Sequence, residues 1–197
     1  MNLTDRILRQ FADSAELKRD SAAALAGPVA TAVERMTAAL ASDRKILVCG
    51  NGGSAADSQH FAAELVGRFE RERPELAAIA LTVDTSILTA VANDYAFEQV
   101  FARQVRALGR EGDVLLALST SGNSPNVVAA VEVARERDLV VVALTGRDGG
   151  RIGAMLGDDD VHLCVPHERT ARIQEVHLLI LHCLCDGIDC LLLGVED

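Results

Sequence analysis

Five short apolar segments, separated by stretches with helical periodicity, constrain the fold of this chain more than any other feature. An apolar run of this length without alternation is typical of a strand that is buried on both faces. Strands that alternate with helices predict a parallel sheet with helices on both sides. We therefore predict an α/β fold, a three-layer α/β/α sandwich around a five-stranded parallel sheet. The predicted strands are residues 45–50, 77–82, 114–118, 139–145 and 161–165.

The segment before the first strand is expected to be helical over residues 3–41, because its apolar residues recur at spacings of three and four. Gly27 and Pro28 predict a break that divides it into two helices. Such helices have no place in a minimal sandwich, so we expect residues 1–41 to pack on partner subunits, and residues 42–197 to form a single structural unit. The further predicted helices are residues 55–69, 85–92, 97–108, 126–137 and 170–193, with a glycine-rich loop at 146–153.

The loop after the third predicted strand is rich in hydroxyl groups. Ser124 before Pro125 is typical of a helix N-cap followed by the first helical residue. A strand, a polar turn and a helix N-terminus can form an anion site, because free backbone N–H groups and the helix dipole point at one spot. An ordinary polar loop with a good cap is the alternative, but the many donors favour a phosphate esterified to a small molecule. The candidate phosphate-binding residues are Ser119, Thr120, Ser121 and Ser124.

The turn after the first predicted strand contains Asn51, Gly52 and Gly53. Residues 50–55, GNGGSA, fit the G-x-G-x-x-A fingerprint of dinucleotide sites, but the acidic residue that should follow about 20 positions later comes too late, at Asp84. We therefore expect no nucleotide cofactor, only glycines that let the backbone approach a ligand closely. Because ligands bind at the carboxyl ends of parallel strands, this turn and the Ser119 loop are predicted to share one edge of the sheet.

Two histidines have candidate partners on their own helices. His60 and Glu64 are four residues apart and share a helix face, as a surface pair, a metal-ligand pair or an acid/base pair. His182 lies among apolar residues of the terminal helix. A histidine in such surroundings is either a hydrogen-bonded core residue or a ligand. Helical geometry leaves its partner open between Gln174 and Glu175.

Composition excludes several classes of protein. The net charge is −10 and no basic cluster is visible, so we expect no nucleic-acid partner. We also expect no signal peptide, because the N-terminal segment MNLTDRILRQ has no long apolar region. No membrane span is expected either, because Asp186 and Asp189 interrupt the most hydrophobic stretch. The five cysteines form no CxxC pair, as in a protein of the reducing cytoplasm.

With these features in place, the chain resembles the sugar isomerase (SIS) domain family over essentially its whole length, and within it the bacterial isomerases of heptose phosphates. The resemblance is carried by the segments GNGGSAADSQHFAAEL, ANDYAFEQVF, LSTSGNSPNV, ALTGRDGG and RIQEVHLLILH. It implies interconversion of sedoheptulose 7-phosphate and D-glycero-D-manno-heptose 7-phosphate for lipopolysaccharide core synthesis. It also implies a flavodoxin-like sandwich, and a homotetramer with sites at subunit interfaces and one zinc ion per subunit.

The resemblance further implies roles for individual residues. The implied metal ligands are His60, Glu64, Gln174 and His182, which selects Gln174 over Glu175. The implied sugar-phosphate contacts are Asn51, Gly52, Gly53, Glu64, Asn93, Asp94, Ser119, Thr120, Ser121, Ser124 and Gln174. From the chemistry of aldose–ketose isomerisation, we predict Glu64 as the catalytic base and His182 as the catalytic acid.

Two features weigh against a simple transfer of the family's activity. Ala171 stands where some members carry an aspartate near the substrate. A non-catalytic adaptor that associates with a replication initiator is also similar over the full length, but lacks the full Glu-plus-His pair. Because this chain keeps both Glu64 and His182, the enzyme is favoured over the adaptor, with isomerisation of another sugar phosphate as a further alternative.

Overall fold

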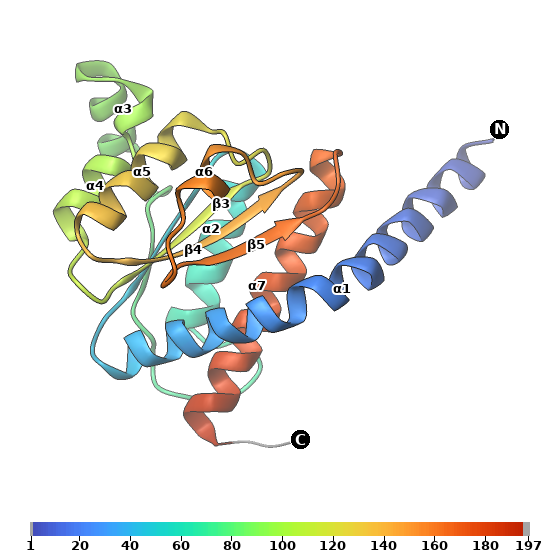
Figure 1. Ribbon diagram of the computed structural model, residues 1–197, viewed down its shortest axis with the longest axis horizontal. Coiled ribbons are helices and arrows are strands. Elements are labelled where there is room, and N and C mark those ends of the chain that lie inside the picture. The colour runs from blue at the N-terminus through green and yellow to red at the C-terminus, as the bar shows by residue number, and fades with distance from the viewer. Residues whose placement is uncertain (1, 195–197) are drawn as a thin grey trace.

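The chain forms a five-stranded sheet with helices on both faces in a computed structural model that describes residues 2–194 (Figure 1). Residue 1 and residues 195–197, which belong to the predicted segments 1–41 and 42–197, lie outside the described residues. The strands are β1 (Ile46–Gly50), β2 (Ala78–Ala80), β3 (Val114–Ser119), β4 (Val140–Gly146) and β5 (Val161–Val165). They are ordered β2-β1-β3-β4-β5 and every neighbouring pair is parallel. The predicted three-layer fold and its five strands are confirmed.

Side chains alternate between the two faces of the sheet, as strand geometry requires. In β1, Ile46 and Val48 belong to a core shared with one set of helices, whereas Leu47 and Cys49 belong to a core shared with the other set. The first face carries α1 (Leu3–Ala41), α2 (Gly53–Val66) and α7 (Thr170–Leu193). The second carries α3 (Thr85–Asp94), α4 (Ala102–Leu108), α5 (Pro125–Glu136) and α6 (Gly150–Met155).

The predicted break at Gly27 and Pro28 is wrong, because α1 is one continuous helix of 39 residues with Pro28 inside it. Its buried side chains continue at helical spacing on both sides of the proline, from Leu17 and Leu25 to Val33. Packing against α7 and β5 therefore outweighs the hydrogen bond that Pro28 cannot donate. The first turns of α1 project beyond the sandwich (Figure 1).

Two shorter helices also differ from expectation. Residues 97–108 are not one helix but a 3-10 turn, Phe97–Gln99, followed by α4. The glycine-rich segment 146–153 is not all loop, because α6 begins at Gly150. Glycine is a poor helix former, so propensity gave no signal for α6.

By length and composition, α7 is the one helix within residues 2–194 that could cross a membrane. Its buried residues contribute to the core beneath the sheet, and its Asp189 pairs with Arg73. We therefore interpret α7 as a core helix of the sandwich.

The strand order fixes where a ligand can bind. From β1 the chain crosses to β2 on one side and then returns to β3 on the other, so the order reverses between β1 and β3. In open parallel sheets, ligands bind at such a switch point, outside the carboxyl ends of the strands. The Asn51 turn follows β1 and the Ser119 loop ends β3, so both lie at this point.

Candidate active site

The turn between β1 and α2 packs directly against α7. Gly52, the N-cap of α2, has a φ of 56°, a left-handed conformation that favours glycine. Gly53 leaves room for Gln174 of α7, because a Cβ at Gly53 would lie 2.5 Å from Gln174 Nε2. Gln174 is thus held at the N-terminus of α2, where backbone N–H groups and the helix dipole favour polar or anionic groups.

A pair of side-chain amides joins the two predicted ligand loops. Asn51 Nδ2 donates to Asn126 Oδ1 at 2.7 Å, and Asn126 Nδ2 donates back to Asn51 Oδ1 at 2.8 Å. Asn126 is buried in the first turn of α5, immediately after the Ser119 loop. The predicted convergence of the two loops is therefore a direct contact.

The Ser119 loop is closed by its own hydroxyl groups and by the loop after β4. Ser119 Oγ and Ser124 Oγ are 2.9 Å apart, and the Ser124 side chain makes no cap hydrogen bond to α5. Gly122 has a φ of 64° and lies so close to the Gly149 carbonyl that no Cβ would fit. Ser121 Oγ accepts from the backbone N–H of Asn123 at 3.2 Å. The loop is thus a compact hydroxyl cluster at the N-terminus of α5, as the anion-site interpretation requires.

The two histidines and the glutamate singled out from the sequence meet between α2 and α7. His60 Nε2 lies 3.0 Å from His182 Nε2 and 3.5 Å from Glu64 Oε1. The His182 ring also packs against Phe69, with ring centroids 5.6 Å apart. His182 is half-buried and faces this cluster, so it is not a satisfied core histidine. We call His60, Glu64 and His182 the histidine cluster.

The core histidine of α7 is instead His177. It is fully buried, and its Nε2 donates to the Thr145 carbonyl at 2.8 Å. Burial lowers the pKa of His177 to about 4, against the opposing effect of that hydrogen bond. Near the histidine cluster, burial raises the pKa of Asp57, one turn before His60, whereas the charge of His60 opposes that rise.

Other candidate residues lie apart from this cluster. Asn93 and Asp94 are exposed at the end of α3, where Asn93 Nδ2 donates to Asp94 Oδ1 at 2.7 Å. They were predicted in a turn but form the last two residues of the helix. Glu175, the alternative to Gln174, pairs with Arg172 at 2.7 Å.

The histidine cluster offers the donor types that zinc prefers, two imidazole nitrogens and a carboxylate oxygen. Tetrahedral zinc ligands are about 3.4 Å apart, so the two histidine nitrogens would need to separate by only a few tenths of an ångström. Within residues 2–194, no three His, Cys, Asp or Glu side chains form a ready metal site as they stand. The cluster therefore fits zinc in ligand type, and its two histidine nitrogens need only a small separation. Gln174, about two helical turns before His182 on α7, stays the further predicted ligand.

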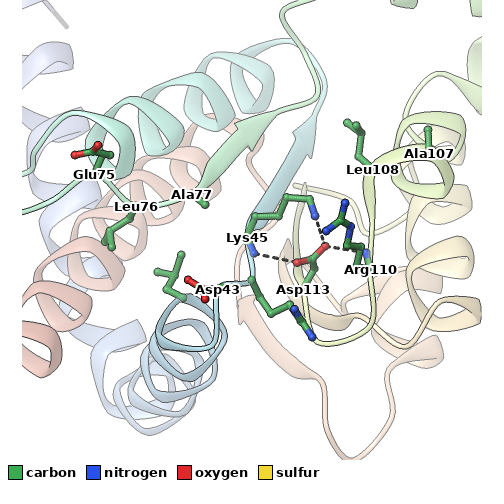
Figure 2. A pocket seen from close by; sticks show the side chains of 11 residues that line it. Asp43, Lys45, Glu75, Leu76, Ala77, Ala107, Leu108, Arg110 and Asp113 are labelled. Atoms are coloured by element: carbon green, nitrogen blue, oxygen red, sulfur yellow. Dashed lines mark hydrogen bonds and ion pairs between the residues drawn. The ribbon is translucent and has the colours of Figure 1, made fainter.

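A separate open cleft of about 540 Å³ lies at the opposite, amino-terminal edge of the sheet and contains none of the candidate site residues (Figure 2). Its buried carboxylate, Asp113, accepts from Lys45 Nζ at 2.6 Å and from the backbone N–H groups of Lys45 and Arg110. These three donors tie the starts of β1 and β3 together, so we assign Asp113 a structural role.

Comparison with known proteins identifies the family to which this chain belongs. The sequence pattern of the SIS domain family matches residues 10–146. Phosphoheptose isomerase of Aromatoleum aromaticum is 72% identical over 197 residues, which is all of both chains. The chain belongs to the SIS domain family. Within that family, its similarity is to the phosphoheptose isomerases.

Two solved structures extend the likeness of this SIS domain to three dimensions. Phosphoheptose isomerase from Neisseria gonorrhoeae has a TM-score of 0.91 and 58% identity, covering 95% of this chain and 99% of that one. The enzyme from Francisella tularensis has a TM-score of 0.93 and 48% identity, covering 96% and 99%. The similarity therefore includes α1 and α7 as well as the sheet.

Sequence reasoning missed Asn126 and Arg73. Asn126 follows Ser124 and Pro125, where an early helical position gave no reason to expect a buried amide. Arg73 lies in an irregular segment between α2 and β2, where arginine is ordinarily solvated.

Proposed function

We propose that this chain is a phosphoheptose isomerase that interconverts sedoheptulose 7-phosphate and D-glycero-D-manno-heptose 7-phosphate. The proposal is carried by the full-length similarity to phosphoheptose isomerases, together with a His–Glu–His cluster between α7 and α2, the helix that begins at the Asn51 turn. The chemistry moves one proton between C1 and C2 and another between their oxygens, through an enediol. Such a reaction needs a base at carbon, an acid at oxygen and an anchor for the phosphate.

The histidine cluster supplies groups of the right kind for proton transfer. Glu64, whose carboxylate is mostly shielded from solvent, acts as the base at carbon. His182 acts as the acid at oxygen, and the contact with His60 keeps its ring turned toward α2. A well-placed acid or base contributes about 10²–10⁴-fold to the rate.

The two ligand turns bind and orient the sugar phosphate. Ser119, Thr120, Ser121 and Ser124 donate to the phosphate at the N-terminus of α5. The Asn51–Gly52–Gly53 turn and Gln174 contact the sugar nearer the histidine cluster. Anchoring the phosphate away from the reacting carbons places C1 and C2 within reach of Glu64 and His182. Asn93 and Asp94 remain predicted contacts, and their exposure at the end of α3 leaves them available to a ligand.

One zinc ion per subunit is part of the proposal, with His60, Glu64, Gln174 and His182 as the residues that would hold it. Because a group bound to zinc is a poor proton carrier, Glu64 and His182 would act as base and acid when their ligation loosens during turnover. When bound, zinc would polarise the substrate carbonyl and stabilise the developing negative charge on oxygen. The ligand types in the histidine cluster support this assignment.

A homotetramer is also proposed, supported by apolar surface on the projecting part of α1. Leu3, Ile7, Leu8 and Phe11 are 47–74% exposed and lie on one side of the helix. Light scattering should give about four times the chain mass, and Leu8→Glu with Phe11→Glu should lower it. Arg9→Glu, on the opposite side of the helix, should leave the mass unchanged. A monomeric wild-type protein would contradict the proposal.

We further place the enzyme in the cytoplasm, in the synthesis of the lipopolysaccharide core. The five cysteines are free thiols within residues 2–194, and such thiols persist in a reducing compartment. The proposed substrate, sedoheptulose 7-phosphate, supports the assignment to lipopolysaccharide core synthesis.

The decisive experiment incubates the purified protein with sedoheptulose 7-phosphate and follows the aldose product, with and without a chelator. We expect turnover that the chelator abolishes and zinc restores. Glu64→Gln and His182→Ala should each lower kcat by at least about a hundredfold. The matched controls Glu136→Gln and His167→Ala, outside the site, should retain kcat. Absence of product from any C5–C7 ketose phosphate would favour the adaptor alternative.

A further inference from the structure

Arg73 is a buried arginine between the two helices that carry the histidine cluster. Its Nε donates to Asp189 Oδ1 of α7 at 2.6 Å, and the two side chains are only 1% and 3% exposed. Within residues 2–194, the other carboxylate oxygen of Asp189, Oδ2, is buried and has no hydrogen-bond donor. This carboxylate therefore depends on Arg73 for its charge partner.

The rest of the Arg73 guanidinium holds the last turn of α2. Its Nη2 donates to the Glu64 carbonyl at 2.8 Å, and its Nη1 donates to the Leu65 carbonyl at 2.8 Å. Since α2 ends at Val66, these carbonyls belong to the end of a helix, where no intrahelical N–H follows to pair with them. A cation there also complements the negative end of the helix dipole. Arg73 thus fixes the backbone of the residue whose side chain is the proposed base.

Asp189 brings the same restraint to the other helix. It lies seven residues after His182, about two helical turns, so the two side chains share one face of α7. The contacts form a closed circuit, from the Glu64 backbone through Arg73 and Asp189 along α7 to His182, and back through His60 to α2. The circuit fixes both the separation of the helices and their rotation about their axes.

We propose that Arg73 and Asp189 are positioning residues that set α2 and α7 so that His182 faces His60 and Glu64. Neither side chain belongs to the histidine cluster itself, so the pair acts through the helices. A buried ion pair of this kind is weak evidence for stability, because apolar residues of similar volume often replace one without loss. The Arg73 guanidinium joins one carboxylate and two backbone carbonyls in a fixed geometry. An apolar pair cannot supply that geometric specificity.

This inference rests on the proposed function for its kinetic test, but not for its metal-binding test. The variant is Arg73→Met with Asp189→Leu, which removes both buried charges together. We expect kcat for sedoheptulose 7-phosphate to fall at least tenfold and KM to change less than threefold, because the Ser119 loop is untouched. We also expect zinc to bind about 10–100-fold more weakly in a chelator competition, as when groups that orient metal ligands are removed. The visible spectrum of bound Co²⁺ should change as well.

Lys45→Met is the matched control, since it removes the charge partner of another buried carboxylate, Asp113, at the opposite edge of the sheet. It should lower stability while kcat and the zinc Kd stay within about twofold of wild type. Unchanged kcat and zinc Kd in the folded double variant would overturn the proposal.

If the double variant fails to fold, Arg73→Lys tests whether Arg73 is a positioning residue. Lysine keeps the charge but lacks the planar fork that joins the carboxylate to both carbonyls, so it should show the same losses. Wild-type kcat and zinc Kd in Arg73→Lys would overturn the proposal. A wild-type protein without isomerase activity would remove the proposed function, whereas the zinc titration would still test the positioning pair.

Discussion

At the scale of single residues, the site depends on one missing side chain. Gly53 lets Gln174 reach the N-terminus of α2, because an added Cβ would lie 2.5 Å from Nε2 and 3.1 Å from Cδ of that side chain. In Gly53→Ala we expect the flexible amide to move away, so stability should change little. Since displacements of about 1 Å can cost a hundredfold in rate, kcat should fall at least tenfold. Steady-state kinetics and thermal unfolding measure the two effects.

Gly27→Ala is the control, since a Cβ at that helical position meets no atom within 4 Å. It should retain kcat and raise the unfolding temperature, because alanine is favoured over glycine in helices by about 1 kcal/mol. Wild-type kcat in Gly53→Ala would show that Gln174 does not need this space.

At the scale of elements, the sequence was informative wherever local pattern and tertiary packing agree. The apolar runs predicted all five strands, and the signal is clearest for the central strands β1, β3 and β4, which are apolar on both faces. Pro28 misled for the opposite reason: local chemistry predicts a break, but α1 continues because residues on both sides of it pack on the same core. Propensity is a weak guide where such packing decides.

The pairing of elements sets another limit on prediction. Spacing along α7 puts Glu175 nearly in line with His182 and Gln174 about 80° away from it, and it did not decide which one is the partner. Only the packing of α7 on α2 and α1 separates them, because it turns Gln174 toward Gly53 and Glu175 toward Arg172. Arg73 and Asp189 were out of reach for the same reason, since they meet across 116 positions of sequence.

At the scale of the whole molecule, topology predicted which edge of the sheet brings the two candidate ligand loops together. Two loops that follow different strands meet at the edge where the strand order reverses, and the Asn51–Asn126 amide pair joins them there. The same packing that builds this edge buries His177 beneath it, beside the Thr145 carbonyl at the end of β4. The hydrophobic core that stabilises the fold therefore also supports the candidate site.

Burial of His177 predicts that this core weakens in acid. Its pKa is lowered from 6.5 to about 4, and within residues 2–194 its Nδ1 is buried without a partner, so a proton there would be a buried charge. Between pH 6.5 and about 4 the unfolded chain binds this proton and the folded chain does not, so stability falls as the pH falls. The full loss is about 3 kcal/mol, and it levels off below pH 4.

Urea unfolding from pH 4 to 8 at a fixed protein concentration measures this loss against His177→Gln, which can still donate to Thr145 but cannot titrate. Above pH 6.5 the variant should differ from wild type by a constant free energy of unfolding. Below it, the wild type should lose about 3 kcal/mol relative to the variant. Half-buried His162, whose pKa burial also lowers, is present in both proteins and cancels in the difference. Parallel curves across the whole range would mean that His177 is protonated in the folded core at little cost, which its fully buried position argues against.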